Sequence, residues 1–303
     1  MTSHKIIVVT ACKNEERNLP KLIESMESQT IKPVLWLIVD DGSTDRTSEI
    51  IEEAKKKHKW IQSIRLNGSK KRDLGLHYAS ILKKGFDNAI ERCKINGINY
   101  EYLVNIDADM VLESAFFEKL IARFEKDPKL GVASGGIYHY KGKKIVRVNV
   151  RESEPSGADM VIRRECFEDC GGFPVSYACD SVFNTKAKLR GWRTKRFENV
   201  IAIETRDTSS AEGYWRGYVL RGRAAYYLNF NFFHVIFKSI MYLIRKPHYI
   251  GIAYLYGYLS DILRRNSKIR DRDIRFYYKY IRMKEIIQYY GAKLKIGKKR
   301  NDD

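Results

Sequence analysis

Residues 100–109, YEYLVNIDAD, join a strand-length apolar run to two aspartates that stand two positions apart. Side chains alternate between the two faces of a strand, so Asp107 and Asp109 point to the same side. Two carboxylates at such a short distance repel each other. This repulsion raises the pKa of one of the two carboxyl groups unless a cation lies between them. Carboxylate oxygens suit Mg²⁺ or Mn²⁺, which also ligate substrate phosphates. The stretch therefore predicts a site for a metal–diphosphate at the end of a buried strand.

A second pair of aspartates with the same spacing, Asp271 and Asp273, occurs in a basic, helix-like stretch. No apolar strand leads into this pair, and we interpret it as solvated surface. The strand before Asp107 is what separates a candidate site from a chance repetition of the pattern.

Short apolar strands alternate with amphipathic helices through the first two-thirds of the chain. We expect strands at Ile6–Thr10, Val34–Val39, Ile61–Leu66 and Tyr102–Ile106, and helices at Asn18–Ser28, Asp45–His58 and Leu74–Cys93. This alternation predicts an α/β fold with a mostly parallel sheet covered by helices. Ligands of such sheets bind outside the carboxyl ends of the strands. Polar clusters at residues 10–15, 40–45 and 105–109 all follow strands, so they meet on one rim.

Length and composition indicate a folded intracellular protein. The chain has 303 residues, 44% of them hydrophobic, enough to bury one large core or two small ones. Its five cysteines are an odd number with scattered spacing, and we expect free thiols in a reducing compartment. We find neither a leader with a cleavage site nor a run of about 18 uncharged apolar residues. The expected location is therefore cytoplasmic.

The chain carries five motifs in a fixed order: TACKNEE at 10–16, VDDGSTD at 39–45, DAD at 107–109, GGF at 171–173, and Asp180 followed by LRGW at 189–192. Together they resemble the family 2 glycosyltransferases, over roughly residues 4–230. The resemblance implies a GT-A fold, which is a Rossmann-like sheet flanked by helices. It implies a catalytic domain at 1–212, in which residues 1–110 bind the nucleotide sugar and residues 111–212 face the acceptor, followed by a helical region at 213–303.

The resemblance also implies which residues contact the donor. Asp41 matches the aspartate that binds the nucleobase, and its carboxylate can accept a hydrogen bond from a base N–H. Thr10 and Glu15 match further nucleotide contacts, and Arg72, with Lys71 as its alternative, matches an arginine that contacts the nucleotide. Two plainer interpretations stay open: an ordinary Asx turn around Asp41, and a solvated basic turn around Arg72.

For the chemistry, the resemblance implies a metal held chiefly by Asp109 with help from Asp107, which also contacts the nucleotide sugar. Asp180 matches the general base of inverting members, although an aspartate near a helix start is also a common N-cap. Cys179 stands where most members have glutamate. A base without an enzymic nucleophile would invert the anomeric carbon in a single displacement.

We therefore expect an inverting hexosyltransferase that uses Mn²⁺ or Mg²⁺. It would move sugar from a nucleoside-diphosphate sugar to a hydroxyl of a glycan or of a lipid-linked acceptor. One alternative is a nucleotidyltransferase, although the glycine-rich phosphate loop of that class is missing after the first strand. Another is a basic protein that binds nucleic acid, but no recognition module is present, and we expect no nucleic-acid partner.

The region after Glu212 is aromatic and basic. The net charge of the chain is +19, and the last 40 residues carry 14 Lys and Arg against 5 Asp and Glu. Residues 230–244 are too short to span a bilayer and contain Lys238. We expect either peripheral attachment to an anionic membrane at its cytoplasmic face or a helical cap on the catalytic domain. The Gln-x-x-Arg-Trp motif typical of processive synthases is absent from the sequence, so we do not expect such a synthase.

Overall fold

The first half of the chain builds four parallel strands from the alternating pattern of strands and helices. A computed structural model describes residues 5–68, 75–141, 144–148, 151–206 and 213–288. It divides into two units, Met1–Thr208 and Ser209–Asp303. In the first unit, the strands β1 (Ile6–Cys12), β2 (Leu35–Asp40), β3 (Ile61–Arg65) and β4 (Tyr102–Ile106) pair in the order β3-β2-β1-β4, all parallel. The four predicted strands are confirmed.

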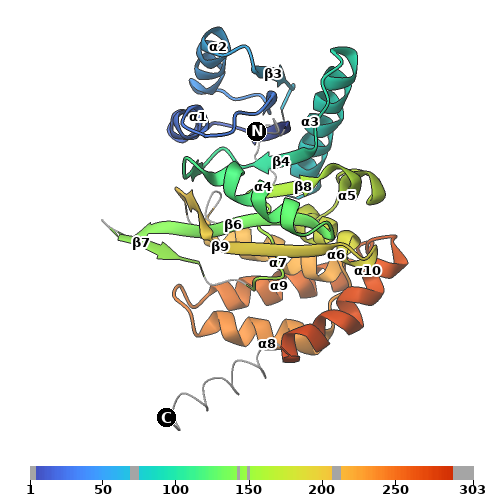
Figure 1. Cartoon of the computed structure of the whole chain (residues 1–303). Coiled ribbons are helices and arrows are strands. Elements are labelled where there is room, and N and C mark those ends of the chain that lie inside the picture. Colours follow the sequence, from blue (N-terminus) through green and yellow to red (C-terminus); the bar gives the residue numbers. More distant parts are fainter. Residues whose placement is uncertain (1–4, 69–74, 142–143, 149–150, 207–212, 289–303) are drawn as a thin grey trace, which may run out of the picture. The chain divides into compact units, whose positions relative to one another are not determined.

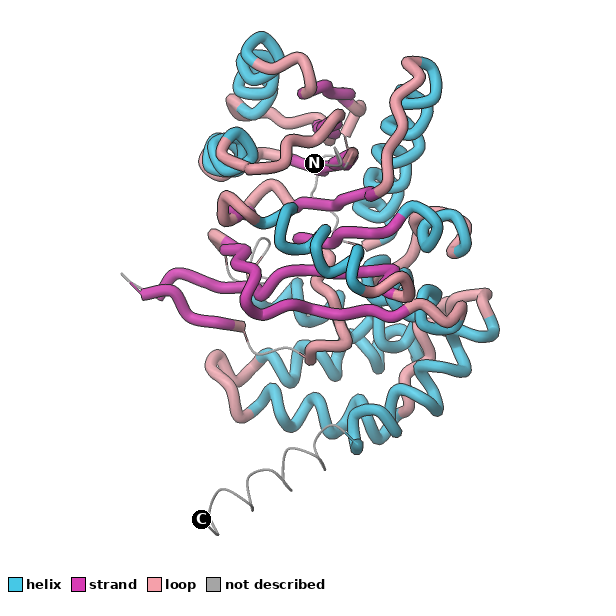
Figure 2. The backbone as a smooth tube through the Cα atoms, viewed as in Figure 1, coloured by secondary structure: helices cyan, strands magenta, loops and turns pink. Residues whose placement is uncertain are grey.

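Helices cover both faces of these strands (Figures 1 and 2). They are α1 (Leu19–Glu27), α2 (Thr47–Lys57) and α3 (Leu76–Ile95). Alternate residues of β1 enter different cores: Ile6 and Val8 lie in one hydrophobic cluster with Leu19 of α1, while Ile7 and Val9 lie in another with Phe86 of α3. Burial on both faces is why these strands are continuously apolar rather than alternating.

Beyond β4 the sheet becomes mixed. It continues through β8 (Asp159–Arg163), β6 (Leu130–Lys141), β9 (Arg193–Glu204) and β5 (Met110–Leu112), and β7 (Lys144–Arg147) pairs with β6. The pairs β4–β8, β6–β8, β6–β7 and β5–β9 are antiparallel. The expectation of a mostly parallel sheet thus holds for the half of the sheet formed by β1 to β4, and the other half is mixed. The reason is that β6, β7 and β8 follow one another without an intervening helix, and a parallel pair needs such a crossover.

Three further helices belong to this half of the first unit. They are α4 (Phe116–Lys126), α5 (Arg164–Asp169) and α6 (Cys179–Leu189). The aromatic side chains of α4 pack into the core on one face of the sheet, and Phe183 of α6 packs into the core on the other face. All five cysteines lie in the described part of the chain, are buried and form no disulfide, as the sequence predicts.

The second unit is helical, with α7 (Tyr214–Tyr227), α8 (Phe232–Leu243), α9 (Ile250–Leu263), α10 (Arg272–Phe276) and a π-helical turn at Tyr277–Ile281. The helices α7 and α9 meet backbone to backbone, because a Cβ atom at Gly222 would lie 1.9 Å from the carbonyl oxygen of Tyr254. Asp271 caps α10 by accepting from the N–H groups of Asp273 and Ile274, so this second aspartate pair is a helix start. Within the described residues, no helix is long and apolar enough to cross a membrane.

Candidate active site

Asp107 lies directly after β4 and is held by two side chains. The Tyr78 hydroxyl of α3 donates to its Oδ1 at 2.6 Å, and the Asn105 amide donates to the same oxygen at 3.2 Å. Burial, together with the charge of nearby Asp109, raises the pKa of Asp107 to about 7. The carboxylate pair expected from the sequence is therefore present, and its mutual repulsion is expressed in that pKa.

Asp109 precedes β5, and its partner is a cation of the chain itself. Arg206, which follows β9, donates from Nε to Oδ2 of Asp109 at 2.9 Å. A terminal guanidinium nitrogen of Arg206 reaches Oε1 of Glu15 at 2.8 Å. Thr205 reinforces this contact, because its N–H and its hydroxyl both donate to the Asp109 carbonyl oxygen at 2.9 Å. The ends of β1, β4 and β9 are thus joined through one guanidinium.

Sequence reasoning missed Arg206. It lies 97 positions from Asp109 and 191 from Glu15, and no local pattern marks it. The only available signal is a cationic residue directly after a strand whose end faces two carboxylates. That signal requires the sheet order, which the sequence does not supply beyond β4.

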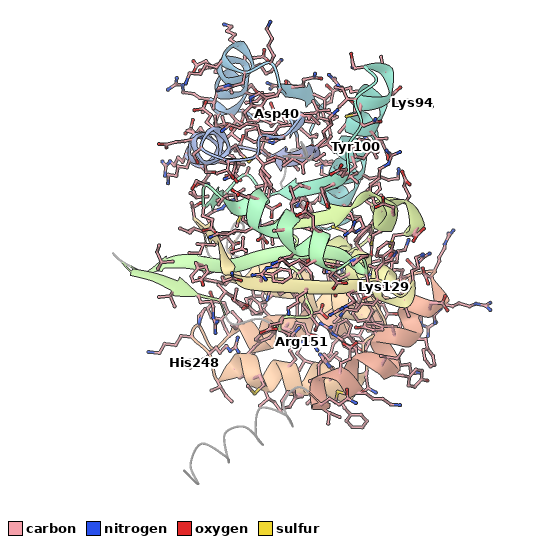
Figure 3. The ribbon with its side chains drawn as sticks, in the orientation of Figure 1. Asp40, Lys94, Tyr100, Lys129, Arg151 and His248 are labelled. Carbon is pink, nitrogen blue, oxygen red and sulfur yellow. The ribbon has the colours of Figure 1, made fainter. Side chains whose placement is uncertain are left out.

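The two adjacent aspartates at the end of β2 have different tasks. Asp40, labelled in Figure 3, accepts from the N–H of Ser43 at 2.8 Å and from the Ser48 hydroxyl at 2.6 Å. It therefore forms the turn, which was the plainer interpretation of this motif. The carboxylate of Asp41 takes no part in that turn, and it lies 3.3 Å from the Lys13 ammonium and 3.0 Å from Nε2 of His77.

Of the other expected donor contacts, the structure brings Glu15 to the cluster but not the side chain of Thr10. Thr10 is fully buried, and its hydroxyl accepts from the Trp36 indole at 2.9 Å. Glu15 is also buried and binds Arg206 and the Asn18 amide. Arg72 and its alternative Lys71 lie outside the described residues.

Asp180 is the second residue of α6 and does not cap it. Ala178 occupies the N-cap position with a left-handed backbone and makes no side-chain cap hydrogen bond. A Cβ atom at Gly157 would lie 2.7 Å from the Cβ of Asp180, so Asp180 packs on the Gly157 backbone. The Gly157 carbonyl oxygen in turn accepts from the Asn105 amide at 2.5 Å. Asn105 therefore links Asp107 to the segment that supports Asp180.

Cys179, where relatives were expected to carry glutamate, is a neutral thiol. Burial raises its pKa well above the usual value, and the negative charges of Asp180 and Asp107 act in the same direction. The thiol lies close enough to both carboxylates for their charges to affect its pKa, and it adds no charge of its own. Asp180 is thus the acid that remains of the expected pair.

The donor set fits a hard divalent cation. Carboxylate oxygens are the preferred ligands of Mg²⁺ and Mn²⁺, and a cation between Asp107 and Asp109 would relieve the repulsion that raises the Asp107 pKa. Among the described residues, no group of three or more His, Cys, Asp or Glu side chains is arranged to hold a metal. A cation at this pair would therefore complete its coordination from substrate phosphate and water, as Mg²⁺ commonly does.

Comparison with curated proteins gives partial matches. A poly-beta-1,6-N-acetyl-D-glucosamine synthase of Staphylococcus epidermidis is 31% identical over 131 residues, which is 43% of this chain and 28% of the relative. A 4,4'-diaponeurosporenoate glycosyltransferase of Staphylococcus haemolyticus is 27% identical over 139 residues, 46% of this chain and 33% of the relative. The chain thus matches about a third or less of each relative's length.

Solved structures match over more of the chain. A mannosyltransferase from Pyrobaculum calidifontis in complex with GDP-Man and Mn²⁺ has a TM-score of 0.54 at 17% identity, covering 84% of this chain and 70% of its own. TarS of S. aureus in complex with UDP-GlcNAc has a TM-score of 0.53 at 16% identity, covering 84% and 71%. These likenesses confirm the predicted GT-A fold.

A family model also matches this chain. The model named "Glycosyl transferase family 2" matches residues 7–175, more than half of the chain. The matched range contains Glu15, Asp41 and the pair Asp107 and Asp109. The resemblance drawn from the motifs is therefore confirmed, and the chain belongs to the family 2 glycosyltransferases.

Proposed function

We propose that this chain transfers a sugar from a nucleoside-diphosphate sugar to an acceptor hydroxyl, with inversion and with the help of Mn²⁺ or Mg²⁺. The observation that carries the proposal is the hydrogen-bonded path from Asp107 through Asn105 to Gly157, on which Asp180 packs. This path links Asp107, one of the two carboxylates proposed for the metal–diphosphate, to the backbone beside Asp180, the acid proposed for the acceptor. A family 2 catalytic domain needs both.

The donor would bind in the half that comprises residues 1–110. Asp41 is the proposed nucleobase acceptor, because its carboxylate is kept out of the β2 turn and oriented by Lys13 and His77. The Lys13 ammonium and the His77 ring hold this buried carboxylate in place, and its oxygens can accept from a base N–H. Glu15 would act through Arg206, which it holds. Thr10 and Arg72 stay proposed donor contacts on the resemblance.

Asp109 and Asp107 would hold the metal. When bound, the cation neutralises charge that develops on the departing nucleoside diphosphate. Asp109 lies at the end of a short loop between β4 and β5. Tyr78 and Asn105 hold Asp107 by hydrogen bonds to its carboxylate. Arg206 supplies a further positive charge at the Asp109 carboxylate.

Asp180 would remove the proton from the acceptor hydroxyl as that oxygen attacks the anomeric carbon. Its place near the start of α6 and beside Gly157 sets it in the half that comprises residues 111–212. Positioned general bases contribute on the order of 10²–10⁴ in rate. Attack opposite the departing diphosphate, with no enzymic nucleophile, inverts the configuration of the anomeric carbon and makes the enzyme an inverting hexosyltransferase.

The acceptor would be a glycan or a lipid-linked sugar at the cytoplasmic face of a membrane. Support comes from the second unit, whose described residues 213–288 contain 15 Lys and Arg against 4 Asp and Glu. An anionic leaflet attracts a cationic protein surface over about a Debye length. Such attachment would concentrate the enzyme beside lipid-linked acceptors.

Donor turnover tests the proposal. The purified chain is incubated with a panel of nucleotide sugars, with Mn²⁺ or with EDTA, and nucleoside diphosphate is quantified by mass spectrometry. Release from donors of one base, only with metal, is expected, and that nucleotide should also raise the melting temperature. If no nucleotide sugar is consumed or bound under any condition, the proposal is wrong.

A further inference from the structure

The helix α8 exposes a continuous apolar stripe. Phe233, Phe237, Ile240 and Ile244 recur at a spacing of three and four residues, which places them on one face of the helix, and all four are exposed. Phe233 is 75% exposed and Ile244 is 69% exposed. Phenylalanine and isoleucine are seldom left so open in a row on a soluble helix.

The neighbouring helix α9 repeats this pattern. Ile252, Tyr256, Leu259 and Leu263 have the same spacing and are also exposed, Leu263 at 84%. The two helices pack side by side, with His248 in the turn between them (Figures 1 and 3). The two stripes belong to one helical hairpin that we call the α8–α9 face, made of the eight residues just named.

The α8–α9 face is not required by the core of its own unit. The opposite sides of these helices supply the buried cluster that holds the unit together, including Val235, Tyr242, Ile250 and Tyr254. The Ser239 hydroxyl also donates to the Gly251 carbonyl oxygen at 2.7 Å across the hairpin. The exposed stripes therefore do not contribute to the buried cluster of the second unit.

Charged groups near the hairpin are turned away from the face or neutralised. Asp261 is buried and paired with Arg223 at 3.1 Å. The Lys238 ammonium lies over the rings of Tyr242 and Tyr254. Exposed cations instead stand just beyond the ends of the helices, with Arg245 and Lys246 after α8 and Arg264 and Arg265 after α9. The result is an apolar face bordered by positive charge.

A basic pocket lies beyond the N-terminal end of α8. Its volume is about 310 Å³, and it is lined by Asn229, Arg272, Arg275, Phe276, Lys279 and Tyr280. Lys268 donates to the Asn229 side chain at 2.6 Å. Burial lowers the pKa of Lys268, and the positive charges of Arg275 and Lys279 lower it further. Three cations and two aromatic rings in one pocket suit a phosphate that carries an apolar body.

The geometry connects this pocket to the face. Phe232, at the start of α8, lies with its ring 6.3 Å from that of Tyr258 in α9, and Phe230 stacks on Tyr278 at 4.8 Å. The start of α8 and the residues just before it thus contact the C-terminal half of α9 and the turn that carries Lys279. A ligand whose head occupied the pocket would have its apolar part at the end of the hairpin.

Charge decides which occupant fits. In a symmetric dimer the same patch would face itself, so the positive borders would oppose each other, and such like-charge contact is costly. A phospholipid leaflet offers acyl chains to the stripes and anionic phosphates to the border at once, which is how amphipathic basic helices bind in the plane of a membrane.

We propose that the α8–α9 face inserts into the interface of an anionic phospholipid leaflet and that the basic pocket takes the phosphate of one headgroup. This inference deepens the membrane attachment in the proposed function, on which it rests, by naming the surface and the lipid class. It makes no use of the donor site, so the two can fail separately.

Vesicle co-sedimentation of the full chain tests the proposal, without donor or metal. Vesicles contain phosphatidylcholine alone or mixed with phosphatidylglycerol, at low and high salt. Binding should need phosphatidylglycerol and weaken with salt. Phe233→Ser with Leu263→Ser should reduce it at least about tenfold, through loss of buried apolar surface. The matched control, Ile95→Ser with Ile145→Ser, removes two exposed apolar side chains of the first unit and should leave binding unchanged.

The pocket has its own matched pair. Arg272→Gln, Arg275→Gln and Lys279→Gln together should abolish the preference for phosphatidylglycerol. Lys56→Gln, Lys57→Gln and Lys59→Gln remove the same charge from the end of α2 and the turn after it, and should leave most of that preference. Equal losses in both triple variants would reduce the pocket to general charge attraction and overturn its assignment.

A spectroscopic measurement on the unaltered protein protects the proposal against a variant that misfolds. The Trp215 ring lies 6.3 Å from that of Tyr249 and 6.1 Å from that of Tyr256. Brominated lipids should therefore quench it in anionic vesicles, and Trp215→Phe should remove the quenched component. Binding indifferent to lipid charge overturns the proposal. The proposal is also overturned if the protein sediments as a dimer, and if Phe233→Ser with Leu263→Ser dissociates that dimer while vesicle binding is unchanged.

Discussion

Arg206 lies across the carboxylate of Asp109, with Nε 2.9 Å and a terminal nitrogen 2.8 Å from the same oxygen. The guanidinium therefore occupies part of the surface that a metal ion would use. The same side chain reaches Glu15, whose carboxylate is fully buried. The Arg206 contacts neutralise this acidic cluster, and a metal ion at the proposed site would do the same.

The Arg206→Gln variant should be less stable without metal and more responsive to it. Removing the guanidinium leaves Glu15 and Asp109 uncompensated, at a cost of about 2 kcal/mol, or roughly 4–8 °C in melting temperature. Mn²⁺ should restore part of this loss without nucleotide, and more than in the wild type. Thermal melting in EDTA and in Mn²⁺ measures both effects.

A matched control is Arg193→Gln, which removes an ion pair with Asp127 at 3.1 Å on an exposed arginine. Its stability should change little and its Mn²⁺ response not at all. If Arg206→Gln and Arg193→Gln gain equally little from Mn²⁺, then Arg206 does not share its site with the metal.

Asp109→Asn should abolish transfer and Mn²⁺-dependent nucleotide binding while the chain stays folded. The amide keeps the shape of the side chain, which matters because Asp109 is buried and in contact with Arg206. Isothermal calorimetry with nucleoside diphosphate and Mn²⁺ gives the readout. Asp273→Asn, in the aspartate pair of α10, is the control and should behave as wild type. Near-normal turnover of Asp109→Asn would mean that the pair is only a strand end.

Asp180→Asn should keep donor affinity and lower turnover by at least about a hundredfold, as expected for the loss of a positioned base. Donor affinity is measured by calorimetry and turnover by release of nucleoside diphosphate. Parallel loss of donor affinity would mark Asp180 as a binding or folding residue. The anomeric configuration of the product, read by NMR, should be opposite to that of the donor, and retention would refute single displacement.

Stability without metal should fall as the pH rises from about 4 to 7. Burial raises the pKa of Asp107 to about 7, and burial also raises that of Asp159 to about 7. Between the ordinary value and the raised one, the folded chain binds more protons than the unfolded chain. Its stability therefore decreases with pH, by up to about 1.4 kcal/mol per unit for each proton. Urea midpoints in EDTA at pH 5 and pH 7.5 report this change.

Asp107→Asn should remove its share of that slope, while Asp87→Asn, an exposed partner of Lys83, should not. Mn²⁺ should bind the wild type more tightly as the pH rises through about 7, because the metal needs the ionised Asp107. An unchanged slope in Asp107→Asn would show that this carboxyl ionises normally.

The sequence predicts most of the nucleotide half and little of the second half of the sheet. Strands β1 to β4 are local features, set by apolar runs that need no long-range information. The antiparallel β8 and the parallel pairing of β6 with β9 depend on contacts between distant segments, which periodicity does not encode.

The site divides in the same way. The pair Asp107 and Asp109 could be found from a strand and a spacing of two. The contacts of Asp41 with His77, and of Asp109 with Arg206, join residues 36 and 97 positions apart. Such partners become visible only when the strands are placed in order. The tasks of Asp40 and Asp41 likewise separate only once their hydrogen bonds are known.

Gly157 lies where the two proposed catalytic roles meet, and this has a consequence for protein engineering. Its carbonyl group anchors Asn105, and any side chain there would press on Asp180. A library that varied this loop to recruit new acceptors would therefore disturb donor activation in the same step. Randomisation that spares position 157 and begins at the outer loops should preserve turnover, so the glycine marks the inner limit of the region open to redesign.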